Sequence, residues 1–213
     1  MITGSTRLSA LLLAIVALAC GGGGEPSADG EQAFLSLGTA PPGGAFFVVG
    51  GALADVLNAD VEHDWTATAE ATSGSQENIR RLASGELDFA ISNAAITYFA
   101  VRGDGGWDQA YAARTVMALA PNMVLFLTRT DSGIETIADL RGQRVVIGPA
   151  GAGFEYFVRP LLAAHGLTYD DFTALNATQS AAVGLLADGS VAAVFIGGAV
   201  PTASITQATA SMD

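Results

Sequence analysis

The stretch that decides the fold is Glu70-Ala71-Thr72-Ser73-Gly74-Ser75-Gln76-Glu77-Asn78. It follows a predicted strand, 65–69, and it opens a helix that ends near residue 85. Ser73 and Gln76 have the spacing of a capping box, so we expect Ser73 to cap this helix. The stretch therefore predicts a strand, a short loop and a helix in succession.

Two hydroxyl side chains, those of Thr72 and Ser75, are then left at the N-terminus of the helix. Unpaired backbone amides and the positive end of the helix dipole favour a small anion at such a position, and a carboxylate suits neutral hydroxyl donors. An ordinary capped turn explains the stretch equally well when it is taken alone. The anion-binding interpretation gains weight because similar junctions recur along the chain.

Strand–loop–helix junctions are predicted throughout the sequence. Apolar segments predict strands, and apolar residues at helical spacing predict helices that alternate with them; the strands are expected at 33–37, 87–91, 144–147 and 191–196, and the helices at 45–57, 94–101, 134–140, 154–165, 178–187 and from 202 onward. Two further strands are expected between Val116 and Leu127, split by Pro121-Asn122, and the segment after residue 165 reads as a loop. This alternation predicts an α/β fold with mainly parallel sheets.

The candidate ligand-binding loops all follow predicted strands. In open parallel sheets, ligands bind outside the carboxyl ends of the strands. The loops at these ends are 38–44, 72–75, 92–93, 148–153 and 197–202. The first three belong to the first half of the chain and the last two to the second half, so we expect a cleft between two lobes.

Composition excludes some classes of function. The chain has 213 residues, of which 50% are hydrophobic and 14% charged, enough for a substantial core. Its net charge is −12 and its nine basic residues are all arginine. Without a basic patch that could neutralise phosphates, a nucleic-acid partner is not expected.

The glycine-rich loop 148–153 invites a nucleotide-binding interpretation, which the sequence does not support. A P-loop requires a lysine, and this chain has none. The glycines stand in the order G-x-x-G-x-G, whereas a dinucleotide fingerprint has G-x-G-x-x-G. We therefore expect no cofactor.

Catalytic and metal sites find little support either. No G-x-S-x-G elbow is present, and both His63 and His165 are most simply structural. Asp60, Glu62 and Asp64 alternate along the chain but lack a fourth metal ligand. The chain is therefore expected to be neither an enzyme nor a metalloprotein, although a dyad assembled by folding stays open.

Arg159, in the second turn of the helix after the glycine loop, has two interpretations. It could face the cleft and bind a substrate carboxylate in bidentate fashion. Alternatively, it could pair with Glu155 at i, i+4 on the helix surface, which we favour because that partner is present in the sequence.

The N-terminus resembles a bacterial lipoprotein signal. Arg7 precedes an apolar segment, 8–19, that is too short to span a bilayer comfortably, and the lone cysteine, Cys20, ends it. A glycine-rich tether follows. We expect a signal peptide at 1–19, lipid attachment at Cys20, a tether at 20–32 and a membrane-anchored protein on the periplasmic or extracellular face; a plain secretory signal is the alternative.

The motifs taken together resemble the solute receptors of the TAXI subgroup of TRAP transporters. The resemblance covers nearly everything from Leu35 to Pro201. It rests on Leu37-Gly38-Thr39, Gly43-Gly44, Phe46-Phe47 and the segments 69–78, 82–89, 129–144, 164–171 and 193–201.

This resemblance implies a periplasmic-binding-protein fold with two lobes joined by crossover strands. It implies that a small carboxylate, glutamate-like or a dicarboxylate, is captured for the membrane subunits of a TRAP transporter, with the receptor expected as a monomer. Carried over by position, the ligand contacts would be Gly38, Thr39, Thr72, Ser75, Asn93, Gly151 and Gly153.

Two departures from the family pattern stand out. Ala152 and Phe154 occupy positions where the family usually offers hydroxyls, which puts the ligand type in question. Family members also usually continue past residue 213 and return to complete the first lobe, so the C-terminal part of that lobe is expected to be missing. We expect lobes at 33–123 and 124–213; a periplasmic sensor subunit and an enzyme on the same fold are the alternative functions.

Overall fold

The computed structural model describes residues 32–198 and 203–211. The chain divides into two units, Met1–Glu31 and Gln32–Asp213, and all the described elements belong to the second. The predicted signal peptide, Cys20 and all but the last residue of the predicted tether lie outside the described residues. Among the described residues, no helix is both long and apolar enough to cross a membrane.

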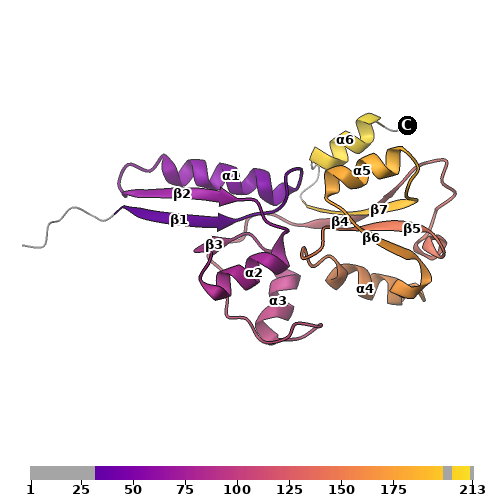
Figure 1. The fold of residues 1–213 in the computed structure, drawn as a ribbon, viewed down its shortest axis with the longest axis horizontal. Coiled ribbons are helices and arrows are strands. Elements are labelled where there is room, and N and C mark those ends of the chain that lie inside the picture. Colours follow the sequence, from indigo (N-terminus) through magenta and orange to yellow (C-terminus); the bar gives the residue numbers. More distant parts are fainter. Residues whose placement is uncertain (1–31, 199–202, 212–213) are drawn as a thin grey trace, which may run out of the picture. The chain divides into compact units, whose positions relative to one another are not determined.

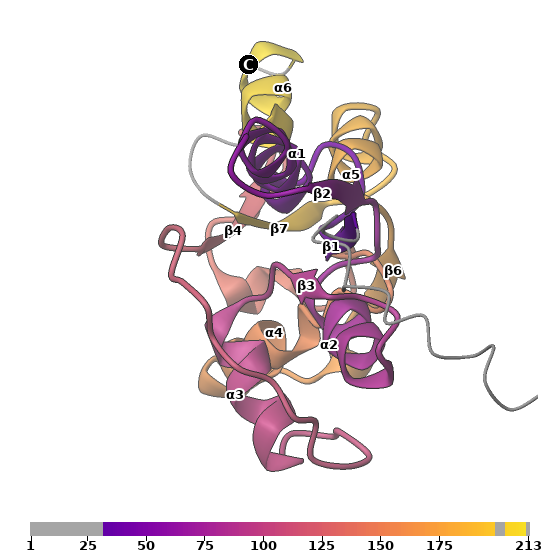
Figure 2. The same ribbon diagram turned by 90° about the vertical axis from the view of Figure 1, so that its left-hand side faces the viewer.

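The first sheet is parallel and has the strand order β2-β1-β3. Its strands are β1 (Ala33–Gly38), β2 (Trp65–Glu70) and β3 (Phe89–Ala90). Helix α1 (Ala45–Asn58) lies on one face, and α2 (Ser75–Ser84) and α3 (Ala94–Arg102) lie on the other (Figures 1 and 2). Each helix follows a strand directly, as the alternating pattern predicts.

The second sheet is mixed and has the order β4-β7-β5-β6. Its strands are β4 (Met123–Thr128), β5 (Arg144–Gly148), β6 (Thr173–Asn176) and β7 (Ala193–Gly198). β5 runs parallel to β6 and β7, while β4 pairs antiparallel with β7. Helix α4 (Glu155–Ala164) covers one face, and α5 (Gln179–Ala187) and α6 (Ala203–Ser211) cover the other (Figure 1).

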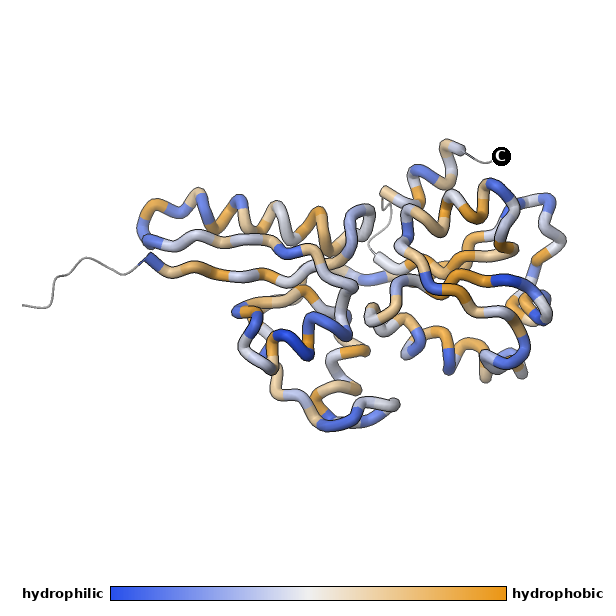
Figure 3. Tube along the Cα trace, viewed as in Figure 1, coloured by the Kyte–Doolittle hydropathy of each residue, from blue (hydrophilic) through white to orange (hydrophobic). Residues whose placement is uncertain are grey.

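The core of the second sheet follows the two-residue period of its strands. Val145 and Phe195 point towards α4, where they pack with Leu162. Their neighbours along the strands, Val146 and Val194, point to the opposite face and pack against α5. Both faces are buried, so these strands read as continuous apolar segments, and Figure 3 shows them in the hydrophobic colour.

A third, largely aromatic cluster joins α2 and α3 to α4. Its buried members are Ile79, Ile96, Ala100, Trp107 and Tyr156. The ring of Tyr156 stacks on Trp107 at a centroid distance of 6.0 Å. It also stacks on Phe99 at 5.6 Å. This cluster therefore packs helices that follow strands of the first sheet against a helix that follows a strand of the second sheet.

Most of the predicted elements are confirmed, and three predictions are wrong. The segment 116–120 forms no strand; Val116 is 77% exposed and pairs with no sheet. The segment read as a loop after residue 165 contains β6, an edge strand that is mostly exposed and so carries no apolar run. The helix expected at 134–140 is only a 3₁₀ turn, Ile137–Leu140. Another such turn, Tyr169–Asp171, precedes β6.

Candidate functional site

An open pocket lies at the carboxyl ends of the strands. Its empty volume, part of which is open solvent, is about 510 Å³. The loops after β1, β2, β3 and β5 line it, together with the start of α5, the end of β7 and Asn122, which precedes β4. This is where the topology of parallel sheets places a ligand.

The N-termini of five helices border this pocket. The pocket is lined by the N-cap residues of α1 to α4, which are Gly44, Gly74, Asn93 and Phe154. It is also lined by the first residue of α5, Gln179. The lining contains no charged side chain among the described residues. Since each helix N-terminus carries a partial positive charge and unpaired amides, the pocket favours polar acceptors and anions without using an arginine.

Ser75 and Asn93 are the predicted site residues that line the pocket. The Ser75 hydroxyl oxygen accepts a hydrogen bond from the backbone N–H of Asn93 at 3.0 Å. The Asn93 Oδ1 accepts from the backbone N–H of Ala95 at 2.9 Å, which caps α3. These bonds use acceptor atoms only, so the Ser75 hydroxyl hydrogen and the Asn93 amide group keep the capacity to donate to a ligand.

Thr39 and Thr72 are both buried, and their hydroxyls bond within the fold. Thr39 Oγ1 donates to the carbonyl of Glu70 at 2.7 Å. Thr72 Oγ1 donates to the carbonyl of Thr39 at 3.0 Å and accepts from the N–H of Gly74 at 3.2 Å. Neither residue lines the pocket; together they fix the loop after β2 against the end of β1.

Gly38 also lies outside the pocket lining. A Cβ atom at this position would stand 2.5 Å from Leu87 Cδ1 and 2.8 Å from Asn78 Oδ1. The fully buried Asn78 amide donates to the carbonyls of Thr39 and Ile91, at 2.8 Å each, and so holds the ends of β1 and β3 together. Gly38 makes room for that amide.

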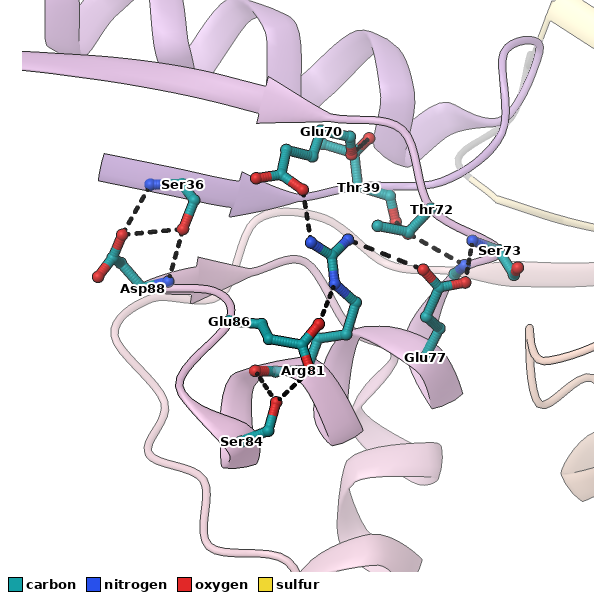
Figure 4. Close-up of polar contacts among 11 residues, drawn as sticks. Ser36, Thr39, Glu70, Thr72, Ser73, Glu77, Arg81, Ser84, Glu86 and Asp88 are labelled. Atoms are coloured by element: carbon teal, nitrogen blue, oxygen red, sulfur yellow. Dashed lines mark hydrogen bonds and ion pairs between the residues drawn. The ribbon is translucent and has the colours of Figure 1, made fainter. Parts of the chain in front are cut away.

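The prediction that Ser73 caps α2 is wrong. The N-cap residue is Gly74, and its φ of 121° is a conformation that glycine adopts readily because it has no Cβ. No side chain caps the helix there. Instead, the backbone N–H of Ser73 donates to the Glu77 carboxylate at 2.9 Å, and the residue lines the pocket. Arg81 lies 3.8 Å from the same carboxylate and 2.6 Å from Glu70, so it holds the base of this loop (Figure 4).

Gly151 and Gly153 shape the glycine loop without lining the pocket. Both have positive φ, 81° and 84°. The carbonyl of Gly151 accepts from the backbone N–H of Glu77 at 3.1 Å, and a Cβ at Gly153 would stand 3.0 Å from Ile96 Cδ1. The two glycines therefore bring the loop after β5 against α2 and α3, while Ala152 between them lines the pocket.

Five lining residues lie outside the ligand-binding loops predicted from the sequence: Ala45, Phe46, Asn122, Phe154 and Gln179. Gln179 is 8% exposed and donates from Nε2 to the carbonyl of Gly197 at 2.8 Å. It follows the N-cap residue Thr178 at a strand–loop–helix junction, but that junction is visible only once β6 is recognised as a strand.

Phe154 takes the place that the family resemblance would give to a hydroxyl residue. A Cβ at Gly148 would stand 2.2 Å from Phe154 Cδ2, and one at Gly197 would stand 3.2 Å from Phe154 Cζ. The ring therefore fits against two glycines and contacts Phe195 edge-on at 5.6 Å. This wall of the pocket is apolar.

Arg159 does not reach the pocket. Its guanidinium carbon lies 4.6 Å from the centroid of the Tyr169 ring, which is a cation–π contact with a residue that does not line the pocket. The ion pair predicted with Glu155 does not form. Burial of the Tyr169 hydroxyl raises the pKa of Tyr169 to about 12.

The other polar clusters are structural. His63 Nδ1 lies 3.0 Å from an Asp60 carboxylate oxygen, and its ring stacks on Trp65 at 4.4 Å. His165 caps the C-terminus of α4. Across residues 32–198 and 203–211, no group of three His, Cys, Asp or Glu side chains is placed to hold a metal ion.

The sequence profile of the NMT1-like family matches residues 37–213. This chain belongs to the NMT1-like family. Solved structures of similar fold also match this NMT1-like chain, and the matches cover most of its length.

Three of these structures illustrate the similarity. The alkanesulfonate-binding protein SsuA of Xanthomonas axonopodis pv. citri, bound to MOPS, is 20% identical with a TM-score of 0.54 over 78% of this chain and 55% of that one. A protein of Bordetella bronchiseptica RB50 is 19% identical with a TM-score of 0.59, over 85% and 56% of the two chains. A binding-protein component of an ABC phosphonate transporter of Pseudomonas aeruginosa is 13% identical with a TM-score of 0.57, over 78% and 58%.

These similarities confirm the predicted fold class. The NMT1-like chain has a periplasmic-binding-protein-like α/β fold, in which parallel strands are flanked by helices. It spans somewhat more than half the length of the solved structures that it matches.

Proposed function

We propose that this chain is the ligand-capturing part of an extracytoplasmic solute-binding protein and has no catalytic activity. Its ligand would be a small organic acid, glutamate-like or a dicarboxylate. The observation that carries the proposal is the pocket bordered by five helix N-termini and lined by no charged side chain. Helix N-termini are anion-binding sites in their own right.

In this account the acid group of the ligand lies at the start of α2 and α3. The hydroxyl of Ser75 and the amide of Asn93 donate to it, in addition to backbone N–H groups of the first helical turns. The other predicted site residues do not contact the ligand in this account. They hold the pocket loops in place instead; they are Gly38, Thr39, Thr72, Gly151 and Gly153.

Capture would involve movement of two lobes, 33–123 and 124–213, about the connection before β4. Contacts such as that of Gly151 with Glu77 would form as the lobes close on the ligand. A ligand that contacts both lobes stabilises the closed state through its differential affinity for it.

The membrane partner we propose is a TRAP-type transporter, on the strength of the TAXI-like sequence motifs. The protein would be held at the periplasmic or extracellular face by a lipid on Cys20. Intact-mass measurement of the membrane fraction, with Cys20→Ser as the control, tests the anchor: wild type should carry acyl chains, and an unmodified protein released in soluble form would contradict it.

Calorimetric titration tests the function itself. Glutamate, glutarate, ethanesulfonate and methylphosphonate would be titrated into the full chain, its Ser75→Ala variant and the matched control Ser84→Ala, which lies on α2 outside the pocket. We expect at least one acid to bind, and we expect Ser75→Ala to weaken it by roughly ten- to a hundredfold, since a hydrogen bond to a charged group is lost. Equal affinities for Ser75→Ala and Ser84→Ala would place the ligand elsewhere.

A further inference from the structure

Gln179, whose side chain lines the pocket, carries a buried acceptor atom that forms no hydrogen bond within the described part of the fold. Its Nε2 donates to the carbonyl of Gly197 at 2.8 Å, which fixes the orientation of the amide because the reversed arrangement would bring two oxygens together. Its Oε1 is buried and has no hydrogen-bond partner among residues 32–198 and 203–211. The side chain, 8% exposed, lines the pocket.

A second unpaired acceptor borders the same strand end. Asn122 also lines the pocket, and its Oδ1 is buried without a partner in the described part of the chain. It directly precedes Met123, whose register partner is Gly198, the last residue of β7. Gln179 is bonded to the neighbouring Gly197, so both unpaired oxygens belong to side chains around the end of β7.

The other side of the pocket has the opposite character. Ser75 and Asn93, which follow strands of the first sheet, have donor groups to offer. Phe46 and Phe154 also contribute to the lining, together with Pro41 and Pro149. The residues that line the pocket therefore carry donor groups beside the first sheet, unpaired acceptor atoms beside the second sheet and apolar side chains between them.

We propose that the ligand of this pocket carries a hydrogen-bond-donating nitrogen, an amine, amide or ring N–H, which binds Gln179 Oε1 and Asn122 Oδ1 at the end of β7. The inference rests on the proposed function and narrows its ligand class. An acid group at the start of α2 and α3 and a donor nitrogen at β7 are joined by a small apolar body.

A plain dicarboxylate does not meet these requirements. Its second carboxylate has only acceptor atoms, and it would face two amide oxygens that also accept. A donor nitrogen instead satisfies acceptors that are otherwise left buried and unpaired, and unpaired buried groups are unfavourable. The same reasoning explains selectivity, because a site built to bond a donor rejects the analogue that lacks it.

Paired probes separate donation from charge. Succinamate and levulinate have the same length and the same carboxylate, and differ in an amide NH₂ against a methyl group. Glutamate and glutarate, and phenylalanine and 3-phenylpropionate, differ by one amino group. Each pair would be titrated calorimetrically into the full chain and into the variants Gln179→Met, Asn122→Leu and Gln143→Met.

The variants are matched in size and chemistry. Gln143 is exposed and lies outside the pocket, so Gln143→Met is the control for Gln179→Met. Gln179→Met also removes the bond to Gly197, so its folding is checked by thermal unfolding. Asn122→Leu is the second variant, because the unpaired Asn122 Oδ1 supplies the fold with no hydrogen bond in the described residues.

We expect the donor-bearing member of a pair to bind about tenfold tighter or more, as for one buried hydrogen bond. This advantage should shrink in Gln179→Met or Asn122→Leu and persist in Gln143→Met. Equal binding of both members, with binding still dependent on Ser75, would overturn this inference and leave the proposed function standing. An advantage that survives in both pocket variants would also overturn it, and no binding by any probe would overturn both proposals.

Discussion

The backbone N–H of Glu77 donates a hydrogen bond to the carbonyl oxygen of Gly151, with 3.1 Å between the two atoms. It joins the first turn of α2 to the glycine loop after β5, and it requires Gly151 to keep a φ of 81°. A residue with a Cβ is disfavoured in this left-handed region by about 1–2 kcal/mol.

Gly151→Ala should therefore lower the free energy of unfolding by about 1–2 kcal/mol. The control is Gly184→Ala, within α5, where a Cβ meets no atom within 4 Å and alanine is the better helix former. Denaturant unfolding of both variants decides: if Gly151→Ala is as stable as wild type, the loop does not need this conformation.

Tyr156 should be the main packing residue of the aromatic cluster that joins α4 to α2 and α3. Its ring stacks on both Phe99 and Trp107. Tyr156→Leu removes these stacks and leaves a cavity, so we expect a loss of about 2 kcal/mol of stability and a red shift of Trp107 fluorescence. Tyr98→Leu, on the 54% exposed Tyr98 of α3, should change neither. Equal behaviour of the two variants would show that the cluster does not hold α4.

Arg81 should stabilise the base of the pocket loop through three carboxylates, Glu70, Glu77 and Glu86 (Figure 4). Arg81→Met leaves these carboxylates uncompensated, and we expect a loss of about 1 kcal/mol that shrinks at high salt because their repulsion is screened. Arg102→Met, which removes an exposed pair with Asp104, should leave the melting temperature unchanged. A deficit for Arg81→Met that is independent of salt would argue against an electrostatic role.

The carboxylate of Asp88 should make the first sheet sensitive to acid. It accepts from the backbone N–H and the hydroxyl of Ser36, both at 2.8 Å, and these bonds lower the pKa of Asp88 (Figure 4). A lowered folded-state pKa stabilises the protein above the unfolded value of about 3.9, and this stabilisation is lost as the pH falls through the folded pKa. The melting temperatures of wild type and Asp88→Asn should differ at neutral pH and converge below about pH 4. A constant difference down to pH 3 would contradict this.

Most helices and strands of the fold could be predicted from the sequence, because each has the hydrophobic periodicity of its type. The predictions that were wrong have physical explanations. β6, at the edge of the sheet, needs no apolar run, and the apolar segment 116–120 finds no strand to pair with. The hydrophobic pattern of a segment reflects its burial against neighbouring elements. It therefore mispredicts a strand that is exposed to solvent and an apolar segment that pairs with no strand.

The site was only partly readable. The position of the pocket follows from topology, and Ser75 and Asn93 line it as expected. The sequence could not show that Thr39 and Thr72 turn inward, since hydroxyls bond equally well to a ligand and to a carbonyl 31 or 33 residues away. It could not reveal Gln179 either, because that residue enters the pocket through tertiary packing against β7.

The measurement that tests the central claim most directly is amide chemical-shift mapping of the full chain during titration with glutamate and succinamate. The account predicts that the backbone amides of Ser75 and Asn93 and the side-chain amide of Gln179 shift together with ligand concentration, while the amide of Ser84 does not. Saturating shifts confined to other residues, or no shifts at these three while a ligand binds, would contradict a binding site at the converging helix N-termini.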